Sequence, residues 1–377
     1  MSVVDIRNRN ARTFVKTWLE KGRDFQPPKP LAKELTEAKR ILDNLIPINS
    51  KGFRGVVLTA IVGQHLDSSY RPLTDFYSCS PRAIFEHGIY YALQEAQIPC
   101  GKSDPLNVAK NIQKLDYDWA KGRRPEAAAK AVVDFLQLLD GAKKTPSLHE
   151  NLLLLYFHEL YSYGQLVKSL HVQMAETDQA VPIEDGKKFA RMSVECPEGG
   201  SVPQFIVGNL ISMLREGDLN TYNVVGHEES VFGTNTTSKK PADVWEVHHD
   251  GTYGALYEIT VKSIDFKRLD DCVDALGALE LADPVVTFIC RLPQDISLLS
   301  LSQPFTVYRG IRFQFLDITQ FICMSYCLLN EEQRGRLKAK MNAFIGDVNR
   351  AVATKEFWNE HVSFDSQSSL SSARVSG

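Results

Sequence analysis

Two short segments of the chain bring carboxylates and lysines into positions that suit hydrolytic chemistry. The first is residues 239–246 (KKPADVWE), and the second, eleven residues later, is residues 257–262 (YEITVK). We interpret them as two strands of a hairpin. Because side chains of a strand alternate between its faces, the polar residues of the second segment are predicted to share one face: Glu258, Thr260 and Lys262. The apolar residues between them can be buried, which leaves the polar face toward a cleft.

Carboxylates on adjacent strands make an oxygen-rich site that suits a hard divalent cation. Mg2+ keeps several of its waters and takes only one or two carboxylates together with substrate phosphate oxygens. A lysine beside such a site can orient or deprotonate a metal-bound water. The pattern therefore indicates hydrolysis of a phosphodiester bond, with Mg2+ as the cofactor.

The same two segments resemble the active-site motif of the PD-(D/E)xK nucleases, and most closely that of the type II restriction endonucleases among them. Residues 241–243 (PAD) are similar to the proline–aspartate element with one residue inserted, and residues 260–262 (TVK) are similar to the (D/E)xK element. The second element departs from the pattern, since threonine does not bind a metal as a carboxylate does.

The resemblance implies a role for each residue that matches the motif. Asp243 becomes the first metal ligand and Lys262 the catalytic lysine. The second metal ligand passes to Glu258, one pleat earlier on the same face as Thr260. Two carboxylates of the following helix, Asp271 and Asp274, are the alternatives for this second ligand. The implied activity is Mg2+-dependent cleavage of double-stranded DNA at a short specific site.

A second interpretation of these residues is a solvated face of a hairpin. On such a face Glu and Lys form at most a surface pair worth about 0.5 kcal/mol. The preceding loop favours the functional interpretation, because hydroxyl, amide and ammonium groups are the donors with which proteins hold phosphate oxygens. The predicted DNA contacts in this loop are Asn235, Thr236, Thr237, Ser238, Lys239 and Lys240.

The surrounding pattern predicts an α/β fold, with a restriction-endonuclease-like mixed sheet flanked by helices and a mainly helical N-terminal domain. Helical spacing of apolar residues, runs of strand-forming residues and the Asp250-Gly251 turn signal give the order αβββαβ. The expected elements are a helix at 203–214, strands at 222–225, 243–248 and 255–263, a helix at 266–281, and a strand at 285–290. The last strand is continuously apolar, as a buried inner strand is.

The N-terminal half carries basic residues in loops and helix starts. Lys102, Lys121, Arg123 and Arg124 are predicted to contact DNA, since arginine offers paired donors to phosphate and guanine. An ordinary solvated turn is the alternative for residues 122–125. Residues 101–103 (GKS) invite comparison with a nucleotide-binding P-loop, but Ala96 stands where that motif requires glycine. No nucleotide cofactor is therefore expected.

Length and composition set limits on what this chain does. Its 377 residues suffice for two domains, with predicted boundaries of 1–180 (helical), 181–328 (nuclease core), 329–362 (C-terminal helix) and 363–377 (disordered tail). Lys and Arg number 43 against 46 Asp and Glu, so no overall basic field indicates a polyanionic partner. The chain shows neither a membrane span nor a secretion leader, and its seven cysteines have no metal spacing. These features favour a cytoplasmic (prokaryotic) location.

The predicted partners follow from cutting both strands of a symmetric site. Two copies related by a two-fold axis do this most simply, so the expectation is a homodimer on double-stranded DNA. A structure-specific or repair nuclease, such as a junction resolvase, is one alternative. A DNA-binding module whose nuclease site has decayed is another, for which Thr260 in place of an acid is the sign.

Overall fold

The computed structural model describes residues 3–28, 32–170, 184–216, 222–227, 240–277, 279 and 284–362. The chain divides into two compact units. Met1–His171 and Asp347–Val352 form the first, which we call the helical unit, and Val172–Gly346 and Ala353–Gly377 form the second, which we call the sheet unit. The predicted tail at 363–377 lies outside the described residues.

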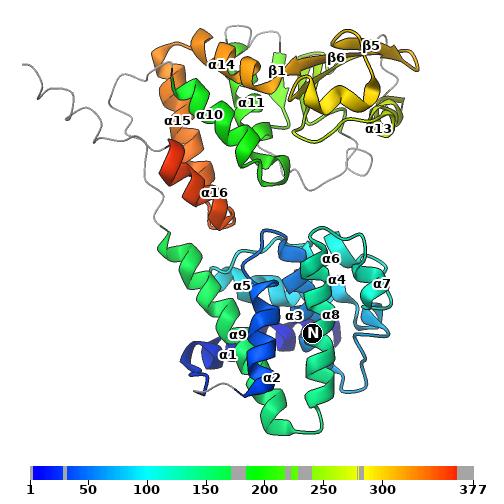
Figure 1. Ribbon diagram of the computed structural model, residues 1–377, viewed down its shortest axis with the longest axis vertical. Coiled ribbons are helices and arrows are strands. Elements are labelled where there is room, and N and C mark those ends of the chain that lie inside the picture. Colours follow the sequence, from blue (N-terminus) through cyan, green and yellow to red (C-terminus); the bar gives the residue numbers. More distant parts are fainter. Residues whose placement is uncertain are drawn as a thin grey trace, which may run out of the picture. The chain divides into compact units, whose positions relative to one another are not determined.

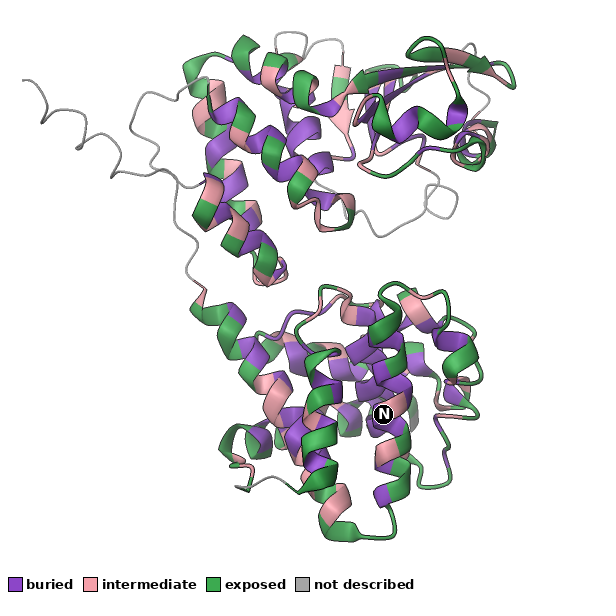
Figure 2. Ribbon diagram, in the orientation of Figure 1, coloured by how far each residue is buried: buried purple, intermediate pink, exposed green. Residues whose placement is uncertain are grey.

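The helical unit consists of helices packed around α3 (Figure 1). Its α-helices are α1 (Val3–Asp24), α2 (Lys33–Asp43), α3 (Lys51–Leu66), α4 (Pro81–Ile84), α5 (Tyr90–Glu95), α6 (Asp104–Ala109), α7 (Tyr117–Ala120), α8 (Glu126–Ala142) and α9 (Pro146–Ser169). Most of α3 is buried, as its apolar and small residues require. Burial follows the inner faces of the helices (Figure 2).

The sheet unit holds a six-stranded mixed sheet in the order β1-β2-β3-β4-β6-β5. The strands are β1 (Tyr222–Val225), β2 (Val244–His248), β3 (Tyr253–Ile259), β4 (Val285–Cys290), β5 (Phe305–Tyr308) and β6 (Ile311–Asp317). β2 is antiparallel to both β1 and β3, whereas β4 runs parallel to both β3 and β6. The helices are α10 (Asp185–Glu195), α11 (Ser201–Leu214), α13 (Phe266–Gly277), α14 (Ile318–Leu328), α15 (Glu331–Gly346) and α16 (Val352–Phe357).

The α/β class predicted from the sequence is confirmed, and so is the order of elements from α11 to β4. Asp250 and Gly251 form the predicted turn, in which Gly251 adopts φ 84° and Asp250 Oδ1 accepts a hydrogen bond from Thr252 N at 2.9 Å. Two predicted elements are wrong in extent. The third strand ends at Ile259 and not at residue 263, and the single C-terminal helix divides into α15 and α16.

Both faces of the sheet are covered by helices of the same unit. One face packs against α10, α11, α14 and α15 through a cluster that includes Val244 and Ile259. The other packs against α13 through a cluster that includes Trp245, Leu256 and Leu269. The expectation that the polar face of β3 borders an open cleft is therefore wrong for Glu258, which is only 1% exposed.

None of the described helices combines the length and the apolar character that crossing a membrane requires.

Candidate functional site

Asp243 and Glu258 lie opposite each other where β2 and β3 meet. The antiparallel register pairs Val244 with Tyr257, and one step further it places Asp243 opposite Glu258. Residues opposite each other in antiparallel strands point to the same face. Asp243 Oδ2 accepts a hydrogen bond from Ile259 N at 3.0 Å, which fixes this carboxylate against the end of β3. Two of the three predicted catalytic residues thus share one face of the sheet.

Glu258 is held by an arginine that the sequence analysis did not single out. Arg268 Nη2 donates to Glu258 Oε2 at 2.5 Å, and the two side chains are 41% and 2% exposed. Arg268 stands on the first turn of α13, whose start is capped by Asp265, since Asp265 Oδ1 accepts from Arg268 N at 2.9 Å. Helical spacing offers a signal for this position, because Arg268 lies one turn before the buried Cys272.

The charges around Asp243 come from Arg268 and Lys240. Burial raises the pKa of the Asp243 carboxyl, and this effect exceeds the opposing effects of the Ile259 hydrogen bond and of the Arg268 and Lys240 charges. Burial lowers the pKa of Arg268, but the carboxylates of Glu258 and Asp243 outweigh burial and raise it. Arg268 therefore stays cationic and partly neutralises both acids.

Lys262 does not share the face of Glu258 through strand alternation, because β3 ends three residues before it. It lies in a bend, where its side chain is exposed and its backbone N donates to Thr260 Oγ1 at 3.2 Å. A residue far along the chain holds this bend, since Arg291 Nη2 donates to Val261 O at 2.5 Å. Lys240, predicted as a DNA contact, is the lysine whose charge acts on Asp243.

The two alternative acids, Asp271 and Asp274, are exposed on α13. Asp274 Oδ1 lies 4.0 Å from Arg309 Nη1. The side of α13 that packs on the sheet carries Leu269, Cys272 and Leu276 instead. Of the three candidates for the second ligand, Glu258 is the one that the register places opposite Asp243.

The donor set of this site fits a hard cation. Two carboxylates on one face are the number that Mg2+ takes from protein, with water and substrate oxygens completing its shell. Asp243 is half-buried, and Glu258 Oε2 accepts a hydrogen bond from Arg268. Within the described ranges, no three His, Cys, Asp or Glu side chains gather in a metal-binding arrangement.

The predicted DNA contacts of the helical unit are on its surface. Lys102, Lys121 and Arg124 are exposed, and the Arg123 guanidinium lies over the Trp119 ring at 5.9 Å from its centroid. The predicted contacts Asn235, Thr236, Thr237, Ser238 and Lys239 lie outside the described residues.

Charge is unevenly divided along the chain. Residues 1–171 carry 24 Lys and Arg against 18 Asp and Glu, whereas residues 172–377 carry 19 against 28. The near balance of the whole chain thus conceals a basic N-terminal half. An asymmetry of this kind is typical of chains in which one part contacts a polyanion.

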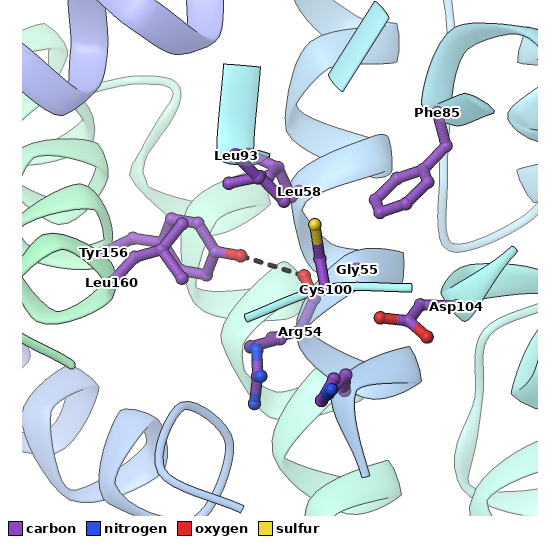
Figure 3. A pocket seen from close by; sticks show the side chains of 10 residues that line it. Arg54, Gly55, Leu58, Phe85, Leu93, Cys100, Asp104, Tyr156 and Leu160 are labelled. Carbon is purple, nitrogen blue, oxygen red and sulfur yellow. Dashed lines mark hydrogen bonds between the residues drawn. The ribbon is translucent and has the colours of Figure 1, made fainter. Parts of the chain in front are cut away.

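A small cavity inside the helical unit does not form a ligand site. Its volume is about 10 Å3, which is room for one water at most. The polar groups around it serve the fold, since Tyr156 Oη donates to Arg54 O at 2.9 Å (Figure 3). Asp104 Oδ2 likewise accepts from Gly101 N at 2.6 Å.

Comparison with protein-family models finds none that matches this chain, and comparison with curated proteins finds no matching relative.

Proposed function

We propose that this protein is a Mg2+-dependent endonuclease that hydrolyses double-stranded DNA at specific sites, as a type II restriction endonuclease does. The observation that carries the proposal is that the register of β2 and β3, continued by one residue to the bend before β2, sets Asp243 opposite Glu258. The order of elements from α11 to β4 and the basic N-terminal half support it.

In this proposal each charged group near the sheet has one task. Asp243 and Glu258 would hold the cation, which when bound would polarise the scissile phosphate and lower the pKa of a bound water. The Ile259 hydrogen bond fixes Asp243, and Arg268 orients Glu258. Lys262 or Lys240 then approaches the phosphate, where an ammonium stabilises the charge that develops in the transition state.

The ion pair between Glu258 and Arg268 favours a second candidate function. A buried carboxylate whose charge is already matched by arginine has less need of a metal. Together with the exposed Lys262 beyond the end of β3, this favours a DNA-binding module that does not cut. The two functions differ in one respect that is easily measured, namely whether DNA is cleaved when Mg2+ is present.

The DNA-binding part of the proposal rests on the helical unit and on dimer formation. Replacing Arg123 and Arg124 by alanine is expected to weaken DNA binding. It should also reduce the slope of log affinity against log salt, by about 0.9 for each phosphate that the variant no longer neutralises. An unchanged slope with altered sequence preference assigns these arginines to base edges. Sedimentation of the DNA complex tests the homodimer, and a monomer on DNA with an unchanged slope contradicts both parts.

The test of the nuclease activity is incubation of purified protein with DNAs of several known sequences, with Mg2+ or with EDTA. Discrete fragments that require Mg2+ support the proposed function. Cleavage of branched DNA alone indicates a junction-resolving nuclease, and binding without cleavage indicates the second candidate function.

A further inference from the structure

The helical unit has a hollow of about 410 Å3 on its surface, which we call the basic pocket. Its lining includes the buried side chains of Pro81 and Leu106 and the half-buried ring of Tyr77. Its rim includes exposed Arg82 and Lys110. An apolar lining with a few polar groups, in a volume of roughly 300–1,000 Å3, is typical of small-ligand sites.

The charge of the basic pocket selects for an anion. Among the residues that the structure describes, no carboxylate lines it. Arg82 is positioned from outside the pocket, because its Nε lies 3.3 Å from Glu86 Oε1, which also accepts a hydrogen bond from Ser103 Oγ at 3.0 Å. Within the described ranges Lys110 has no ion pair, so its charge is not compensated by an acid.

The basic pocket lies between two segments that the backbone ties together. Tyr77 and Arg82 come from one segment, and Leu106 and Lys110 come from the other. Phe76 N donates to Gln113 O at 2.7 Å, and Leu115 N donates to Leu73 O at 3.0 Å. These two long-range hydrogen bonds fix the walls, so ligand binding has little ordering cost.

We propose that the basic pocket binds one nucleotide unit, with its phosphate between Arg82 and Lys110 and its base against Tyr77. Arginine and lysine are the usual side-chain partners of phosphate. An aromatic ring offers a stacking surface to any base, and Asn111 on the rim offers both a donor and an acceptor to a base edge. A free deoxynucleoside monophosphate and an unpaired nucleotide of a DNA strand present this same chemistry.

The test measures binding by isothermal titration calorimetry and does not depend on cleavage at Asp243. The ligands titrated are deoxyadenosine 5′-monophosphate, deoxyadenosine without phosphate, inorganic phosphate, and a 5′-phosphorylated single strand of about twelve nucleotides, within the length that one single-strand-binding domain covers. The variants are Arg82→Gln, Lys110→Gln and Tyr77→Leu. Lys114→Gln is the matched control, because Lys114 is an exposed lysine of the same segment outside the pocket.

The nucleotide is expected to bind more tightly than either deoxyadenosine or phosphate alone, since it engages both the ring and the cations. Lys110→Gln and Arg82→Gln are each expected to weaken nucleotide binding about tenfold or more, because each removes a charge-assisted hydrogen bond. Tyr77→Leu should weaken binding of the nucleotide and leave that of phosphate unchanged. Lys114→Gln should bind as the wild type does.

The two sources of the ligand give different results. If the single strand binds much more tightly than the mononucleotide, and Lys110→Gln weakens the binding of both, the source is a DNA strand. Equal affinities indicate a free nucleotide. The proposal is overturned if the mononucleotide does not bind at millimolar concentration, if deoxyadenosine binds equally well, or if Lys114→Gln loses as much affinity as Lys110→Gln.

Discussion

The hydrogen bond from Ile259 N to Asp243 allows the structural role of this carboxylate to be separated from its chemical role. Asparagine at position 243 keeps an oxygen that accepts this bond, whereas alanine removes it. A backbone N–H left without its partner costs about 1–3 kcal/mol. In a unit of this size, about 1 kcal/mol corresponds to roughly 2–4 °C in Tm, so Asp243→Ala should unfold roughly 2–12 °C below the wild type.

Asp243→Asn should be at least as stable as the wild type at neutral pH without a divalent cation. The reason is that burial disfavours the charged form of Asp243, as its raised pKa indicates. Both variants should lose DNA cleavage, since both lose the anionic ligand. Differential scanning calorimetry in EDTA measures the stabilities. Equal loss of stability in Asp243→Asn and Asp243→Ala refutes the role given to the Ile259 hydrogen bond.

Three further predictions concern charged groups. Arg268→Met leaves the buried Glu258 carboxylate without its partner and should lower the free energy of unfolding by about 3 kcal/mol, whereas adding Glu258→Gln should recover most of it; no recovery in urea titration contradicts the ion pair. Lys262→Ala and Lys240→Ala should each bind DNA. Only the variant that lacks the catalytic lysine should lose two or more orders of magnitude in the single-turnover rate of DNA cleavage. Wild-type rates in both variants exclude a catalytic lysine at these two positions. Burial raises the pKa of Asp104 above its usual 3.8, so the contribution of this carboxyl to stability is present at low pH and is lost as pH rises through the raised pKa. Asp104→Asn should therefore gain stability over the wild type from about pH 4 upward. Parallel profiles of stability against pH for the two proteins refute this.

The order of elements in the sheet unit was predictable because its signals are local. Apolar residues at helical spacing mark α11, and the Asp250-Gly251 turn marks the hairpin of β2 and β3. The helix and the turn needed no knowledge of distant contacts. The position of Asp243 opposite Glu258 depends also on a register shift between Trp245 and Val247, which the turn does not determine.

The end of β3 was not predictable from alternation, because residues far along the chain determine it. Thr260 N donates to Ile289 O at 3.1 Å, and Arg291 Nη2 holds Val261 O. The first of these contacts continues the pairing of β3 with β4, and the second holds the bend that precedes Lys262. The role of Arg268 was missed for a related reason, since it depends on how α13 packs against the sheet. The burial of Glu258 follows from the same packing.

We propose that Asp243 and Glu258 form a Mg2+ site at which DNA is hydrolysed. The most direct measurement is cleavage of DNAs of several known sequences by the wild type, Asp243→Asn and Glu258→Gln, with Asp271→Asn as the matched control on the exposed side of α13. We expect discrete fragments with Mg2+ for the wild type and for Asp271→Asn, and at least about a hundredfold loss of rate for the other two variants. Cleavage by Asp243→Asn at the wild-type rate, or loss of cleavage in Asp271→Asn alone, would contradict this proposal.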